Sequence, residues 1–289
     1  MPAALISTDQ LAQHLSDPAW VVVDCRHNLV DADAGERAYR SAHIPGAHFL
    51  HLDRDLSGAK TGRNGRHPLP GAKTLADRLG ALGIDSNATV VAYDDQGGMF
   101  AARLWWLLRW LGHENVALLD GGITKWQAEM RAVDAHIPQP RAKIFLPAKG
   151  LQHVTVDYVS QHLHQPDMCL IDARAPDRFA GQNETLDPLA GHIPGAVNRF
   201  FKGNLNADGS FKNADVLKKE FLILLGNNSP QQVVHQCGSG VTSCLNLFAM
   251  ELAALHGSKL YAGSWSEWCA DSARPIKRGM DGEMHRDNN

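Results

Sequence analysis

Short, continuous runs of hydrophobic residues alternate along the chain with longer helical segments. Residues 21–24 and 90–93 are β-branched and almost wholly apolar up to their last position, a pattern typical of strands buried in a parallel sheet. Residues 99–111 predict most of a helix, and Gly112 predicts its end. Alternation of this kind predicts an α/β fold in which helices cover both faces of a parallel sheet.

The pattern of the first half recurs in the second half. Residues 169–172 and 232–236 predict strands, and residues 241–256 predict a helix that ends before Gly257. Three sequence matches occur in the same order: Val-Val-Val-Asp-Cys-Arg (21–26) with Cys-Leu-Ile-Asp-Ala-Arg (169–174), Ala-His-Ile-Pro-Gly-Ala (42–47) with Gly-His-Ile-Pro-Gly-Ala (191–196), and Asp-Gly-Gly (120–122) with Ala-Gly-Ser (262–264). Ordered self-similarity predicts two tandem domains of one architecture, and it disfavours two unrelated domains.

The boundary between the domains is marked by prolines. Prolines at positions 138, 140 and 147 favour an extended conformation there. We therefore predict a first domain over residues 1–137, a linker over 138–150 and a second domain over 151–289.

Composition narrows the functional classes. The 289 residues are 44% hydrophobic and 20% charged, which excludes a disordered chain, and the net charge of −3 gives no basic surface for nucleic acid or an anionic membrane. Five cysteines are too few for a disulfide scaffold, and the fifteen histidines lack metal-ligand spacing. The N-terminus lacks a secretion signal, and the longest apolar run, 104–111, is too short to cross a bilayer. We expect a cytoplasmic protein without metal or other cofactor, and without nucleic-acid or membrane partners.

The clearest chemical signal is the sequence His-Gln-Cys-Gly-Ser-Gly-Val-Thr-Ser-Cys at residues 235–244. A strand is expected to end just before Cys237, and a helix is expected to begin near Val241. Gly238 and Gly240 allow the backbone to curl so that its N–H groups converge, and the helix adds the positive end of its dipole. Such a loop lowers the pKa of a thiol and produces a nucleophilic thiolate. The alternative is a buried structural cysteine at a strand end.

A thiolate in an anion-binding loop is compatible with two chemistries. Cysteine phosphatases need an arginine six residues after the cysteine, and that position is Ser243 here. The loop is also too tight for a tetrahedral dianion, whereas one sulfur atom carried as a persulfide fits it. Sulfur transfer is therefore favoured. The first domain has Asp94 where the second has Cys237, so it cannot carry sulfur.

Taken together, the chain resembles the two-domain rhodanese-type sulfurtransferases. The resemblance rests on the repeated His-Ile-Pro-Gly-Ala, on Asp-Gly-Gly (120–122) with Trp126, and on Gly-Ser-Trp (263–265) with Trp268. The loop at 237–242 resembles the 3-mercaptopyruvate branch, because the thiosulfate branch carries Arg-Lys where this chain has Gly238 and Ser239.

The resemblance implies a two-step reaction. Cys237 takes sulfur from 3-mercaptopyruvate as a persulfide, and a thiol, thioredoxin or cyanide then accepts the outer sulfur. Two alternatives stay open at this point: thiosulfate as the main donor, and a persulfide carrier or binding module without turnover.

The resemblance also assigns roles to further residues. Asp53, and His67 in Arg-His-Pro-Leu-Pro (66–70), match residues that reach Ser239 from the first domain and form an Asp–His–Ser proton relay. From spacing alone, either residue would be read as a surface polar group. The loop positions expected to hold the sulfur and the donor are Gly238, Gly240, Val241 and Thr242.

Arg178 matches an arginine that binds the carboxylate of the donor, for which a planar guanidinium is suited. A second arginine usually stands shortly before the second His-Ile-Pro-Gly, but residues 183–190 contain none. Arg199, or else Lys202, just after that motif, is expected to take its place.

Overall fold

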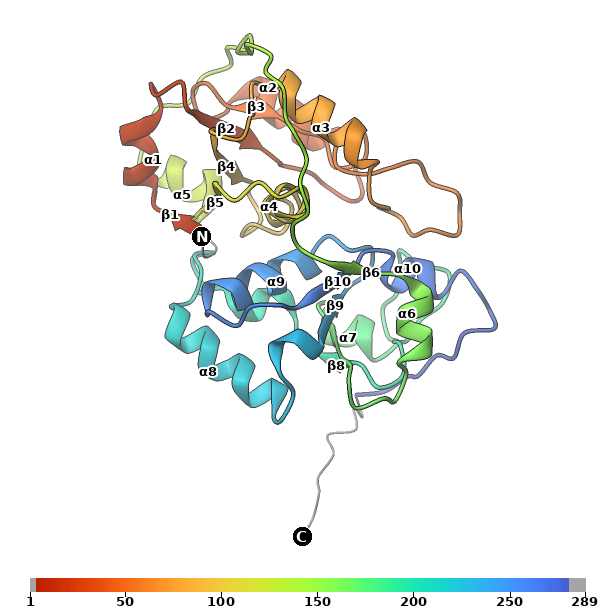
Figure 1. Cartoon of the computed structure of the whole chain (residues 1–289). Helices are drawn as coiled ribbons and strands as arrows, with labels where there is room; N and C mark the ends of the chain where they lie inside the picture. The colour runs from red at the N-terminus through yellow and green to blue at the C-terminus, as the bar shows by residue number, and fades with distance from the viewer. Residues whose placement is uncertain (1–3, 281–289) are drawn as a thin grey trace.

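The computed structural model describes residues 4–280, which form two α/β domains (Figure 1). The first domain is built on a five-stranded parallel sheet with the strand order β1-β5-β4-β2-β3. Its strands are β1 (Ala4–Ile6), β2 (Trp20–Asp24), β3 (His48–Phe49), β4 (Thr89–Tyr93) and β5 (Val116–Leu119). Its helices are α1 (Thr8–His14), α2 (Ala34–Ser41), α3 (Ala72–Ala81), α4 (Ala101–Trp110) and α5 (Gly122–Ala128).

The second domain repeats this topology strand for strand, with the order β6-β10-β9-β7-β8. Its strands are β6 (His153–Val154), β7 (Cys169–Asp172), β8 (Val197–Asn198), β9 (Val233–Gln236) and β10 (Lys259–Tyr261). Its helices are α6 (Val156–Gln161), α7 (Pro176–Phe179), α8 (Ala214–Leu225), α9 (Ser243–Leu252) and α10 (Ser264–Trp268), with 3₁₀ turns η1 (Phe201–Asn204) and η2 (Pro230–Gln232). The predicted fold class, two tandem α/β domains with parallel sheets, is confirmed.

The strands are apolar at successive positions because both faces of each sheet are covered. In β4, Val90 and Ala92 pack into a cluster with α3 and α4, whereas Val91 and Tyr93 pack into another with α1 and α5. In β7, Leu170 packs with α6 and α10, and its neighbour Ile171 packs with α8 and α9. Side chains of successive strand residues point to opposite faces of the sheet, so each strand contributes side chains to two hydrophobic clusters.

The two domains share one hydrophobic core at their interface. Helix α4 of the first domain packs against α9 of the second, and Figure 1 shows these two helices between the sheets. Trp105 and Phe248 meet there edge to face, with ring centroids 5.1 Å apart. The cluster around them includes residues of both domains. This interface brings loops of the first domain over the carboxyl end of β9.

The observed helices are shorter than predicted. The helix predicted over residues 241–256 is α9, whose first residue is Ser243 because Val241 and Thr242 belong to the preceding loop. Its end at Leu252 is followed by Ala254 with a φ of 58°. The helix predicted over 99–111 is α4, and Gly112 follows it with a φ of +80°. Local composition predicts a helix well, but its ends depend on the loops that join it to the sheet.

The chain between the domains has no regular secondary structure. From residue 135 to residue 152 it contains no helix or strand, and the predicted linker lies within this range.

Within residues 4–280, no helix combines the length and apolar character that crossing a membrane requires.

Candidate active site

Cys237 lies directly after β9, and the loop that follows it curls back before α9 begins. The residue is 2% exposed. Its carbonyl accepts from the N–H of Trp265 at 3.0 Å, and its own N–H donates to Ser264 Oγ at 3.2 Å. Gly240 has a φ of +74°, and a Cβ there would lie 2.3 Å from the carbonyl oxygen of Ala262. Only glycine fits the turn at position 240, which supports the reading of Gly240 as a loop former, whereas Gly238 has no positive φ.

The loop stabilises a thiolate at Cys237. Burial alone would raise the pKa of the thiol, but the hydroxyls of Thr242 and Ser243 and the N–H groups of Ser239 and Ser243 near the sulfur outweigh it. The pKa of Cys237 is therefore lowered from its ordinary value.

The other four cysteines differ from Cys237. Burial raises the pKa of Cys169 and Cys269 to about 11 and that of Cys244 to about 12, and it raises the pKa of Cys25 well above the ordinary value. All four are buried core residues. Thiolate character is therefore confined to Cys237.

The corresponding loop of the first domain shows how this turn holds an anion. Asp94 follows β4 as Cys237 follows β9, and its carboxylate accepts hydrogen bonds from four backbone N–H groups at 2.8 or 2.9 Å. Those N–H groups belong to Gln96, Gly98, Phe100 and Ala101. In both domains a turn after a sheet strand, with glycines and a helix start, thus surrounds one buried side chain with N–H groups, although burial still raises the pKa of Asp94.

Ser239 is contacted by a histidine of the other domain. Nδ1 of His67 lies 2.8 Å from Ser239 Oγ, and Nε2 of the same ring lies 3.6 Å from Asp53 Oδ1. Burial is the main cause that lowers the pKa of His67 to about 3, helped by the nearby positive charges of Arg103, Arg66 and Lys60 and opposed by Asp53.

The imidazole is therefore neutral and carries one proton. With that proton on Nε2, which faces Asp53, Nδ1 accepts a hydrogen bond from the Ser239 hydroxyl. The structure thus brings Asp53, His67 and Ser239 together in the order that the resemblance implied.

Asp53 is held by its neighbours on several sides. Burial would raise the pKa of its carboxyl, but the hydrogen bond from the Lys60 ammonium and the positive charge of that group lower it. The Lys60 ammonium lies 2.8 Å from Asp53 Oδ1, and Nε2 of His27 lies 3.8 Å from Oδ2. Lys60 and His27 had no signal in the sequence, since neither belongs to a recognisable motif.

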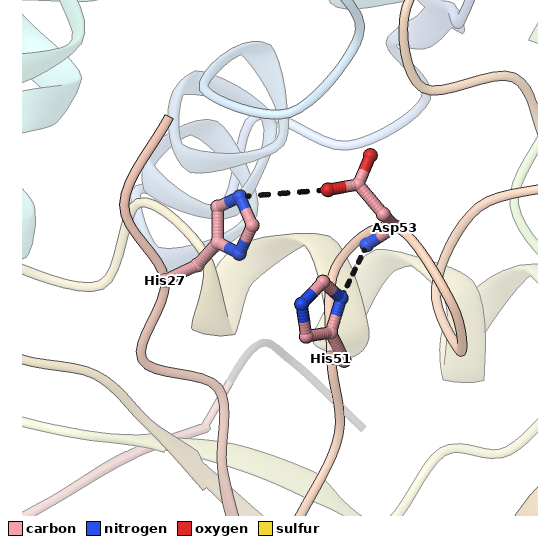
Figure 2. Close-up of side chains that lie close together, drawn as sticks. All are labelled: His27, His51 and Asp53. Atoms are coloured by element: carbon pink, nitrogen blue, oxygen red, sulfur yellow. Dashed lines mark hydrogen bonds and ion pairs between the residues drawn. The ribbon is translucent and has the colours of Figure 1, made fainter. Parts of the chain in front are cut away.

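His27, His51 and Asp53 form a compact group (Figure 2), whose potential ligand atoms lie within 4.8 Å of one another. Nδ1 of His51 accepts from the backbone N–H of Asp53 at 3.1 Å, and its Nε2 faces the carbonyl of Ala32 at 3.0 Å. With Lys60 on the carboxylate, a metal ion would have to displace existing partners. The group orients Asp53, and the absence of a metal stays a prediction.

Two guanidinium groups lie over Gly238, next to the nucleophile. A Cβ at Gly238 would lie 2.7 Å from Nη2 of Arg66 and 3.6 Å from Nη2 of Arg178. Nη2 of Arg178 donates to Glu184 at 2.8 and 2.9 Å, and Nη1 of Arg66 pairs with Asp187. Each arginine is thus oriented by a carboxylate and keeps a face toward the loop.

Arg66 was missed by the sequence analysis, although it directly precedes His67. Arg199, predicted for this role, is not brought to the loop: its Nη2 donates to Glu220 at 2.5 Å and to the Gly203 carbonyl at 3.2 Å. Glu220 on α8 holds the side chain of Arg199 there. Lys202 is exposed on η1.

Comparison with known proteins shows the family to which the chain belongs. A family model described as a rhodanese-like domain matches residues 7–129 and again residues 155–271. The chain is 46% identical to a probable 3-mercaptopyruvate sulfurtransferase of Pseudomonas aeruginosa, over 96% of this chain and 99% of that protein. It is 34% identical to a putative thiosulfate sulfurtransferase of Mycobacterium tuberculosis, over 95% of this chain and 97% of that one.

Solved structures give the same result. The 3-mercaptopyruvate sulfurtransferase of Leishmania major superposes with a TM-score of 0.82 at 28% identity, covering 92% of this chain and 74% of that one. SseA from Escherichia coli, described as a 3-mercaptopyruvate sulfotransferase, superposes with a TM-score of 0.79 at 30% identity, covering 91% of this chain and 99% of that one. The resemblance seen in the sequence is confirmed, and the chain belongs to the rhodanese family of sulfurtransferases, with two rhodanese-like domains.

Proposed function

We propose that this protein transfers sulfur from 3-mercaptopyruvate to a thiol acceptor through a persulfide on Cys237. The observation that carries the proposal is the contact between His67 Nδ1 and Ser239 Oγ, 2.8 Å apart, beside a thiol of lowered pKa. A nucleophile and a proton relay thus stand side by side, which is what cleavage of a C–S bond requires.

In the first step the Cys237 thiolate attacks the sulfur of the donor. A new S–S bond forms while the C–S bond breaks, and its electron pair leaves on the carbon as the enolate of pyruvate. The proton lost from the donor thiol is taken up by the Ser239–His67 pair and returned through the Ser239 hydroxyl to that carbon, which gives pyruvate and an anionic persulfide. Asp53 keeps His67 in the tautomer that accepts from Ser239.

In the second step an acceptor thiolate attacks the outer sulfur of the persulfide. The S–S bond to Cys237 breaks, and the Cys237 thiolate is restored for the next cycle. Low-molecular-weight thiols, a thioredoxin-like protein and cyanide all have the nucleophilic character this step needs. The proposal places the protein in the cytoplasm, where thiols are kept reduced.

The donor is held by the two arginines over Gly238. Arg66 and Arg178 offer planar N–H pairs to one carboxylate, while Glu184 and Asp187 balance their positive charge. A near-neutral site suits the single carboxylate of mercaptopyruvate better than the dianion thiosulfate. Backbone N–H groups of the loop and the Thr242 hydroxyl stabilise the sulfur itself.

Thiosulfate is the second candidate donor, because two guanidiniums near the nucleophile also attract a sulfonate-like group and several relatives are thiosulfate sulfurtransferases. A persulfide carrier without turnover is less well supported, since a carrier has no need of the relay.

Steady-state kinetics with both donors, measured side by side, test the proposal. We expect kcat/KM for mercaptopyruvate to exceed that for thiosulfate by at least about tenfold, or roughly 1.4 kcal/mol. Cys237→Ser should remove both activities, and mass spectrometry should find the added sulfur on Cys237. Equal or better use of thiosulfate would contradict the choice of donor, and sulfur on Cys244 would contradict the choice of nucleophile.

A further inference from the structure

Arg103 is a fully buried cation between the two domains, and no role in the reaction described above has been assigned to it. It lies on α4 of the first domain, and its exposed fraction is 0%. Among residues 4–280, no carboxylate forms an ion pair with it. An arginine is rarely buried without an anionic partner, because removing its charge from water is costly.

The guanidinium of Arg103 joins the two segments that the relay needs. Nη1 donates to the carbonyl oxygen of Gly240 in the sulfur loop at 3.0 Å, and Nη2 donates to the carbonyl oxygen of His67 at 3.1 Å. Weaker contacts from Nη2 reach the carbonyls of Leu56 and Pro68, at 3.4 and 3.5 Å. One rigid planar group thus holds the backbones on both sides of the Ser239–His67 contact.

The charge of Arg103 has its anionic counterpart at the reacting sulfur. Burial lowers the pKa of Arg103, and the sulfurs of Cys244 and Cys237 oppose that effect when they are ionised. Burial raises the pKa of Cys244 to about 12, so that thiol stays neutral. Cys237 is then the group near Arg103 that carries negative charge, first as thiolate and afterwards as persulfide. Nε of Arg103 has no hydrogen-bond partner, so the guanidinium is not fully satisfied by carbonyls.

We propose that Arg103 is a positioning residue of the sulfurtransferase reaction, which clamps the sulfur loop to the His67 segment and stabilises the anionic sulfur on Cys237 across the domain interface. The inference rests on the proposed function and explains why the first domain, which carries no reactive cysteine, is part of the catalytic unit. The charge of Arg103 contributes less to stabilising the anionic sulfur than the hydroxyl and N–H groups of the loop do.

Two substitutions separate the clamp from the charge. Arg103→Met removes both, whereas Arg103→Lys keeps the charge but cannot bridge two carbonyls with a planar fork. The first readout is the pH dependence of Cys237 alkylation by iodoacetamide, followed on the Cys237 peptide in the full chain without any donor. The second is kcat for sulfur transfer with a saturating donor.

We expect Arg103→Met to raise the apparent pKa of Cys237, because it removes a positive charge and frees the carbonyl of Gly240 in the sulfur loop, and to lower kcat at least about tenfold. Arg103→Lys should keep the apparent pKa of Cys237 near the wild-type value and still lower kcat. Trp105→Phe, which loosens the same interface without changing charge, is the control. It should lower the melting temperature and leave the alkylation profile unchanged.

A folded Arg103→Met variant with wild-type kcat and an unshifted alkylation profile would overturn the proposal. If Arg103→Met does not fold, the test rests on Arg103→Lys. An unchanged kcat in Arg103→Lys would refute the positioning role of Arg103. Failure of the proposed function is distinguishable, because it appears as absence of sulfur transfer in the wild type, whereas the alkylation profile is measured without a donor.

Discussion

Replacement of Arg66 by alanine tests how the donor is held. The Arg66 guanidinium contributes one of the two cationic groups over Gly238, and its side chain is 26% exposed. Its partner Asp187 is 2% exposed, so Arg66→Ala removes a cation and leaves this buried carboxylate with only the longer contact to Arg178 Nη2, at 3.6 Å. A charge-assisted hydrogen bond in such a site contributes about 1.5–3 kcal/mol. We therefore expect kcat/KM for mercaptopyruvate to fall by a factor of about 10 to 150.

The assay is steady-state turnover over a wide range of mercaptopyruvate concentrations, with KM and kcat resolved. Most of the loss should appear in KM, because the carboxylate is bound in the ground state and in the transition state alike. Adding Asp187→Asn to Arg66→Ala should recover part of the loss, since it removes a buried negative charge that then has only Arg178 to balance it. Arg63→Ala, an exposed arginine on the same loop, is the matched control.

Arg199→Ala separates this interpretation from the one drawn from sequence. If Arg199 binds the donor, its removal should raise KM as strongly as Arg66→Ala does. We expect a change smaller than about twofold, because its guanidinium is bound to Glu220. A change within twofold for Arg66→Ala, or a larger loss for Arg199→Ala, would refute the reasoning.

Three further predictions concern pH and the sulfur loop. Because the thiolate is the nucleophile and the pKa of Cys237 is lowered, kcat/KM should rise with pH and level off below pH 9.0, the ordinary pKa of the thiol. A rise in kcat/KM with its midpoint at or above pH 9.0 would contradict the assignment. Burial lowers the pKa of His235 to about 3, so the folded chain keeps this ring neutral and loses stability as the pH falls from 6.5 toward 3. Urea unfolding at pH 6.5 and 5.0 should show that the wild type loses about 1.6 kcal/mol more than His235→Leu, and equal losses would argue against it. Gly240→Ala should abolish sulfur transfer through a clash with the Ala262 carbonyl while the chain stays folded by circular dichroism, and retained activity would show that the turn is adaptable.

The sequence alone determines the features of this protein that are local or repeated. Alternating apolar runs predict the strands, the ordered repeat predicts two domains of one topology, and the cysteine between a strand and a glycine turn predicts the nucleophile. These features follow from backbone geometry within a few residues, so a single chain reveals them without knowledge of the fold. The ends of α9 were predicted less well, because they depend on how the sulfur loop and Ala254 leave the helix axis.

Only the tertiary structure decides how the domains complete each other. Arg66 and Arg103 reach the sulfur loop from the first domain, and neither follows a periodicity that marks it as functional. Arg199, close to a recognised motif, is turned instead toward Glu220. The physical reason is that contacts across an interface depend on how α4 and α9 pack, and this packing sums many small interactions between residues far apart in sequence. The role of a charged side chain depends on which partner lies near it in the buried interface. That partner is determined by how the two domains pack together.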